Sequence, residues 1–65
     1  MDPNEDILKV FQELPEHRMT GLWPLMGKYK TACRLSQGTR LDKLAYRKER
    51  ALRLERDLRK QLGLD

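Results

Sequence analysis

Apolar residues recur at intervals of three and four along most of this chain, which is the spacing of one face of an α-helix. The first run consists of Ile7, Val10, Phe11 and Leu14. Asp2 can cap a helix there, and Pro3 suits its first position, where a missing N–H costs nothing. Because Pro15 pushes the residue before it out of the helical conformation, the pattern predicts a short helix over residues 3–14.

The second apolar run follows a polar connection at residues 15–20. It consists of Leu22, Leu25, Met26, Tyr29, Ala32 and Cys33. Thr20 is a suitable N-cap, and Pro24 would still fall within the first turn, where proline is tolerated. Gly38 is a typical C-terminal glycine, so we predict a second short helix over residues 21–36.

The third segment is the longest, because no glycine or proline interrupts the chain from residue 40 until Gly63. It is rich in leucine, arginine, lysine, glutamate and alanine, which are strong helix formers. With Thr39 as its cap, we predict a helix over residues 40–62, about 35 Å long at 1.5 Å per residue. Its apolar face consists of Leu41, Leu44, Ala51, Leu54, Leu58 and Leu62.

Together the three segments predict an all-α fold in one domain, residues 1–65, with two short helices packed on the N-terminal half of one long helix. A chain of this length buries only about 60% of its unfolded surface, so its own core is marginal. We expect this core to contain Ile7, Val10, Phe11, Leu14, Leu22, Met26, Tyr29, Cys33, Leu41 and Leu44.

The second half of the long helix is expected to lie beyond the reach of its short neighbours. Leu54, Leu58 and Leu62 would then form an exposed apolar row, and such a row favours a partner. We therefore predict a helical homodimer, most simply with two-fold symmetry, whose interface consists of these three leucines.

Neither the composition nor any motif predicts an enzyme. Cys33 and His17 are the only soft metal ligands in the chain, whereas a closed zinc site needs four. The four glycines are scattered and match no nucleotide-binding fingerprint. His17 fits an exposed loop residue and Cys33 a buried structural thiol. We expect no catalytic residue, no metal, no cofactor and no small-molecule substrate.

The ends of the chain and its single cysteine bear on the compartment. The first residues are acidic, and no long apolar run exists, so we expect neither a signal peptide nor a membrane span. A lone cysteine is typical of a reducing compartment. We therefore expect a cytoplasmic protein, or a nuclear one in a eukaryote.

The net charge of +4 is unevenly distributed. Residues 1–20 sum to −3, residues 21–38 to +3 and residues 39–65 to +4. The basic side of the long helix could bind phosphates, and nucleic-acid binding by a small regulator is our leading hypothesis. The proposed contact residues are Arg40, Lys43, Arg47, Arg50 and Arg53.

Two aromatic residues bear on this hypothesis. Tyr46 lies on the polar side of the long helix, where an exposed ring could stack on a base. Trp23 stands beside the apolar positions of the second helix, so we expect it in the core.

Several alternatives stay open. Glu49 precedes Arg53 by four residues, as on an ordinary solvated helix face without a binding role. The leucine face could instead dock on a protein, making the chain an interaction module, adaptor or inhibitor. The turn at residues 38–39 also allows a helix-turn-helix, and the amphipathic helices allow contact with an anionic membrane.

Overall fold

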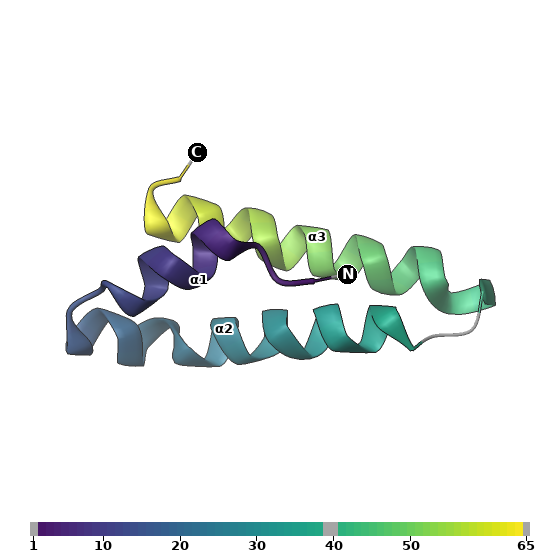
Figure 1. Ribbon diagram of the computed structural model, residues 1–65, viewed down its shortest axis with the longest axis horizontal. Helices are drawn as coiled ribbons and strands as arrows, with labels where there is room; N and C mark the ends of the chain where they lie inside the picture. Colours follow the sequence, from purple (N-terminus) through teal and green to yellow (C-terminus); the bar gives the residue numbers. More distant parts are fainter. Residues whose placement is uncertain (1, 39–40, 65) are drawn as a thin grey trace.

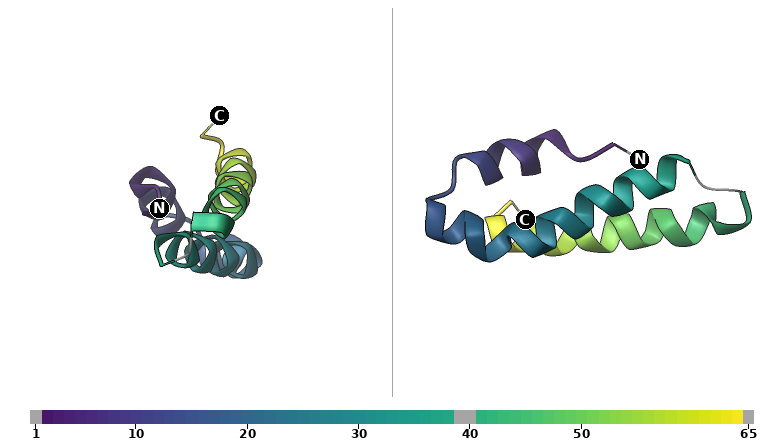
Figure 2. Two further views of the ribbon diagram at one scale, coloured as in Figure 1. Left: turned by 90° about the vertical axis from the view of Figure 1, so that its right-hand side faces the viewer. Right: turned by 90° about the horizontal axis from the view of Figure 1, so that it is seen from below.

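The computed structural model describes residues 2–38 and 41–64, which form three helices and no strand (Figure 1). The helices are α1 (Glu5–Gln12), α2 (Glu16–Gln37) and α3 (Leu41–Leu62). α2 and α3 run antiparallel and side by side, and α1 lies against one end of this hairpin (Figures 1 and 2). The molecule is a rod of 40 × 20 × 16 Å. The predicted all-α fold is therefore confirmed for the described part of the chain.

α1 begins two residues later than predicted, because its N-cap is Asn4 and not Asp2. The Asn4 Oδ1 accepts hydrogen bonds from the backbone N–H groups of Asp6 and Ile7, at 2.8 and 3.3 Å. The Asp2 carboxylate instead accepts a hydrogen bond from the Gln37 Nε2 at 2.8 Å. This bond ties the N-terminal segment to the last residue of α2.

α2 begins five residues before its predicted start. The Pro15 carbonyl accepts the first hydrogen bonds of the helix, so Glu16 is already helical and the predicted connection at residues 15–20 is wrong. Thr20 and Pro24 consequently lie inside the helix rather than at its beginning. With 22 residues, α2 is as long as α3, so the predicted contrast between two short helices and one long helix is also wrong.

α3 matches its predicted segment closely, although its expected cap Thr39 and the first expected residue Arg40 lie outside the described residues. The helix ends in a Schellman motif. Gly63 adopts a φ of +74°, a conformation that favours glycine, and the Leu64 N–H donates to the Arg59 carbonyl at 2.8 Å. Leu64 then packs against the core.

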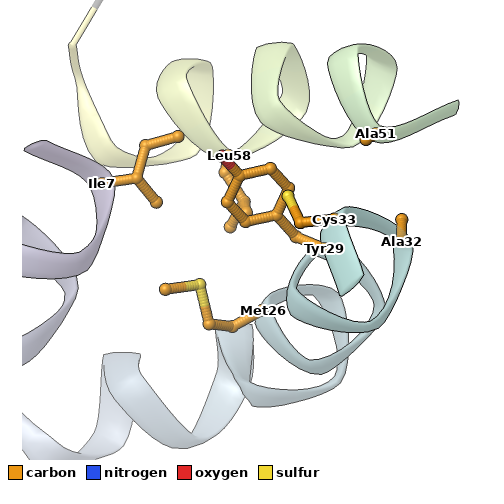
Figure 3. Packing of buried hydrophobic residues seen from close by; sticks show 7 residues of the cluster. All are labelled: Ile7, Met26, Tyr29, Ala32, Cys33, Ala51 and Leu58. Carbon is orange, nitrogen blue, oxygen red and sulfur yellow. The ribbon is translucent and has the colours of Figure 1, made fainter. Parts of the chain in front are cut away.

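The apolar core lies where the three helices meet (Figure 3). Its buried members among the described residues are Ile7, Met26, Tyr29, Ala32, Cys33, Ala51 and Leu58. Four of these were predicted, and a further group of predicted core residues is only half-buried: Val10, Phe11, Leu14, Leu22 and Leu44. The prediction for Leu41 is wrong, since it is 88% exposed. It lies about 100° around α3 from Leu58 and so falls outside the buried face of the helix.

α1 lies beside the C-terminal half of α3, and not beside the N-terminal half as predicted. The short connection at residues 13–15 makes α1 fold back along the first half of α2, and in an antiparallel hairpin this half faces the end of α3. Ile7 and Leu58 accordingly share the core (Figure 3). Leu58 is completely buried, and Leu54 and Leu62 pack against the same cluster. The leucine row predicted as an exposed dimer interface is thus covered by the chain's own helices.

A polar junction of Asn4, Tyr29 and Glu55 holds α1 on the hairpin. The Tyr29 hydroxyl accepts a hydrogen bond from the Asn4 backbone N–H at 2.7 Å and donates to the Glu55 Oε1 at 3.5 Å. The Asn4 Nδ2 donates to the same carboxylate oxygen at 3.0 Å. Burial raises the pKa of Tyr29 to about 12, although the Asn4 N–H opposes this rise. The neutral hydroxyl therefore connects all three helices.

Replacing Leu58 with alanine should destabilise the chain by about 2–5 kcal/mol, because it opens a cavity in the core. Leu52 is a matched control on the same helix, since its side chain is 47% exposed. Leu52→Ala should change the free energy of unfolding by about 0.5 kcal/mol or less. Urea unfolding followed by circular dichroism measures both, and equal losses would contradict the assignment of Leu58 to the core.

The stability of the fold should decrease as the pH rises from about 10 to about 12. In this window Tyr29 ionises in the unfolded chain but stays neutral in the folded one, so the unfolded state is favoured. A shift of this size corresponds to a loss on the order of 2 kcal/mol.

Denaturant unfolding at intervals across this window tests the effect, with Tyr29→Phe as the control. That variant should be less stable at neutral pH, because the Asn4 N–H loses its acceptor. It should also lose less stability than the unaltered chain between the two pH values. The same loss in both chains would show that Tyr29 is not responsible.

Candidate nucleic-acid interface

Folding sorts the charged residues along the rod. Residues 27–38 and 41–50, called here the basic half, carry seven basic and two acidic side chains, a net charge of +5. The other described residues carry six basic and seven acidic side chains, a net charge of −1. α1 places its acidic residues beside the C-terminal half of α3, and it does not extend over the other end of the hairpin (Figure 1). Positive charge is therefore concentrated at the end that α1 does not cover, and the Asp2 carboxylate meets this half at Gln37.

An open groove of about 460 Å³ lies between α2 and α3 in the basic half. We call it the basic groove, and it is lined by Gly27, Lys28, Thr31, Ala32, Leu35, Tyr46, Arg47 and Arg50. Ala32 is buried and belongs to the core, so it forms part of the floor. The groove thus combines small and apolar side chains with three cations and one aromatic ring.

Lys28 and Arg50 reach the basic groove from different helices. Lys28 comes from the middle of α2 and Arg50 from the first half of α3, so only the hairpin brings them together. Both are exposed, and within the described part of the chain neither takes part in an ion pair. Their charges are therefore available to an anionic ligand.

Arg47 has a structural contact as well as a place in the groove. It is half-buried, and its Nη1 donates to the Leu35 carbonyl at 3.5 Å. This carbonyl belongs to the last turn of α2, where carbonyl groups have no N–H partner within the helix. A cation there also complements the negative end of the helix dipole. Arg47 therefore joins α3 to the end of α2 while it lines the groove.

The other three predicted contact residues differ in position. Lys43 is exposed and lies two turns before Arg50 on the same side of α3. Arg53 pairs with Glu49 at 2.9 Å, in an exposed ion pair of the kind that contributes little to stability. Arg40 lies outside the described residues. Of the five predicted residues, the structure brings Arg47 and Arg50 together at the groove.

The five predicted contact residues all belong to the segment of residues 40–53, so they do not include Lys28 of α2. A signal was present, since Lys28, Ala32 and Leu35 recur at helical spacing as a second stripe beside the buried face. For Tyr46 the expectation of an exposed ring is confirmed, because the side chain is 69% exposed.

A second groove, of about 260 Å³, lies between α1 and α2. This apolar groove is lined by Leu8, Phe11, Gln12, Met19, Trp23, Met26, Gly27 and Lys30. Trp23 stands at its edge with 64% of its surface exposed, so the expectation of a buried tryptophan is wrong. Trp23 lies six residues before Tyr29 and therefore about 120° around α2 from it, outside the buried face.

The described residues also bear on metal binding, on the reactivity of the thiol and on membrane spans. They contain no group of three histidine, cysteine, aspartate or glutamate side chains placed to share a metal ion. Cys33 is completely buried, and this burial raises the pKa of its thiol. In residues 2–38 and 41–64, no helix has both the length and the apolar character to span a membrane.

The helix-turn-helix alternative does not match the arrangement of the helices. Such motifs cross their two helices at roughly 90–120°. Here α2 and α3 lie side by side over most of their length (Figures 1 and 2). A single recognition helix is therefore not presented to a ligand, and the two helices form a joint surface.

The basic groove and the uneven charge are the features from which a function can be inferred. They depend on residues of both long helices and on the position of α1. Comparison with known proteins finds no protein-family model, no curated protein and no solved structure that matches this chain.

Proposed function

We propose that this chain is a small, non-enzymatic regulatory protein that binds nucleic acid through its basic half. The observation that carries the proposal is the concentration of a net charge of +5 around one groove, at the end of the rod that α1 leaves uncovered. A positive patch attracts the phosphate backbone and steers its approach. The opposite end is slightly negative, so the chain would approach a polyanion with its basic half first.

The spacing of the cations suits a phosphate backbone. Lys43 and Arg50 are seven residues apart, or about 10 Å along α3. Along a duplex axis this length corresponds to about three nucleotides of one strand, at a rise of ~3.4 Å each. Lys28 adds a contact from the other side of the groove, so three or four phosphates is a reasonable number. Arg50 can also bind a phosphate through two parallel N–H groups.

The alternative is a protein-interaction module that docks through the leucine face of α3, and the burial of this face in the free chain disfavours it. Leu58 is fully buried, and Leu54 and Leu62 pack on the same core. The apolar groove beside Trp23 is the surface that such a module would use instead. The homodimer stays a prediction, without the interface that motivated it.

Salt dependence of binding tests the proposal. A labelled mixed-sequence strand and its duplex should both be titrated between about 50 and about 200 mM salt. Three or four phosphate contacts predict a log–log slope between about −2 and −4. The double variant Lys28→Ala/Arg50→Ala should make the slope shallower by about 1.4 to 1.8, because two contacts are lost.

Arg56→Ala/Lys60→Ala is the matched control. It removes the same charge from exposed positions of α3 outside the basic half, so the slope should stay close to that of the unaltered chain. An equal effect of the two double variants would show that total charge, and not the basic half, determines binding. Failure to bind either probe at the lowest salt would overturn the proposal.

A further inference from the structure

We infer that the basic groove receives one unpaired base of a single-stranded segment, which stacks on Tyr46 while Lys28 and Arg50 bind the phosphates beside it. This inference rests on the proposed function and names the form of nucleic acid that the groove selects. It differs from general phosphate binding because it requires the face of a base to be accessible.

The apolar part of the groove suits the face of a base. Ala32 is buried at its floor, and Leu35 is exposed over 46% of its surface. These two side chains offer no hydrogen bonds but can pack on the face of an aromatic ring, and the cations of the groove lie beside them. The volume of about 460 Å³ lies within the ~300–1,000 Å³ of small-molecule sites.

Tyr46 supplies the stacking surface. Its side chain lines the groove and is nevertheless 69% exposed, so the ring is not engaged in the core. Aromatic side chains beside cations are the usual means of holding single strands, because every base has a face on which a ring can stack. Lys28 comes from α2 and Arg50 from α3, so each of the two helices that form the basic groove supplies a cation.

A duplex cannot present a base in this way. Stacked and paired bases expose only their edges in the grooves of DNA. Lys28 and Arg50 belong to different helices, so a duplex would have to admit both helices to meet both cations. One helix with its side chains is already about 10–12 Å across, and the major groove is about 12 Å wide. Two helices lying side by side are therefore too thick to enter that groove with both cations in contact.

Gly27 lines the basic groove and also the apolar groove. A Cβ at Gly27 would have nothing within 4 Å, as at the other three glycines, so a larger side chain fits there without a clash. The missing side chain leaves room for a ligand to approach the backbone of α2.

The first test compares three probes of one mixed sequence: the single strand, its duplex, and the same strand with abasic sites. The abasic strand keeps its phosphates but has no bases to stack. We expect the intact strand to bind about 5- to 150-fold more tightly than the abasic strand, as for the stacking of one base. The duplex should bind more weakly than the intact strand at equal salt.

The second test replaces the ring. Tyr46→Ala should abolish the preference for the intact strand over the abasic strand, whereas Tyr46→Phe should retain it. Trp23→Ala is the matched control, because it removes another exposed aromatic side chain that does not line the basic groove. It should leave the preference unchanged.

The third test fills the groove. Gly27→Leu should weaken binding of the single strand at least severalfold. Gly21→Leu is the control, since a Cβ there also meets nothing within 4 Å but Gly21 does not line the basic groove. Both variants should be folded and at least as stable as the unaltered chain in urea unfolding, because each removes a glycine from a helix.

The outcomes separate this inference from the proposed function. Equal binding of duplex and single strand, with no effect of Tyr46→Ala, would overturn the unpaired base and leave phosphate binding by the basic half intact. Equal binding of intact and abasic strands would do the same. Absence of binding to all three probes at low salt would overturn the proposed function itself.

Discussion

The hydroxyl group of Tyr29 lies at the point where the three helices meet, and the position of α1 depends on it. It accepts a hydrogen bond from the Asn4 backbone and donates one to Glu55, so a single buried group joins the cap of α1 to both long helices. Asn4 also caps α1 through its side chain and donates to Glu55. The polar groups of this junction have hydrogen-bond partners, and among the described residues no buried side-chain nitrogen or oxygen lacks such a partner. Such satisfied networks favour one arrangement over others.

The position of α1 determines the electrostatics of the whole rod. With α1 folded back beside the C-terminal half of α3, its acidic residues lie next to the basic residues of that half. The residues of the basic half sum to +5, and the N-terminal segment brings the Asp2 carboxylate to this half, at Gln37. Repulsion among these cations opposes compaction, and a bound polyanion would relieve it. The feature that we propose to bind a ligand therefore also lowers the stability of the free chain.

In the basic half, small side chains are buried between α2 and α3. Cys33 and Ser36 are buried there, and the Ser36 hydroxyl donates to the Cys33 carbonyl at 2.7 Å. These small side chains allow α2 and α3 to lie close together without a third helix. Arg47 completes this end by donating to the Leu35 carbonyl. In the basic half, α2 and α3 can therefore pack directly against each other without α1, although the basic groove lies between them.

Local residue chemistry by itself determined that the chain is helical and where α3 runs. Three local signals were sufficient for this: uninterrupted helix formers, the glycine after Leu62 and the spacing of apolar residues. Each of them involves residues that lie close together in the sequence. The same spacing identified Ile7, Met26, Tyr29 and Cys33 as core residues. The start of α2 was misread, because Thr20 resembles a cap although Pro15 already precedes a helical residue. Only the tertiary structure decided which apolar row is covered and which cations meet. Those features depend on how α1 folds back, and that follows from contacts between residues such as Asn4 and Glu55, which are far apart in the sequence and leave no local pattern.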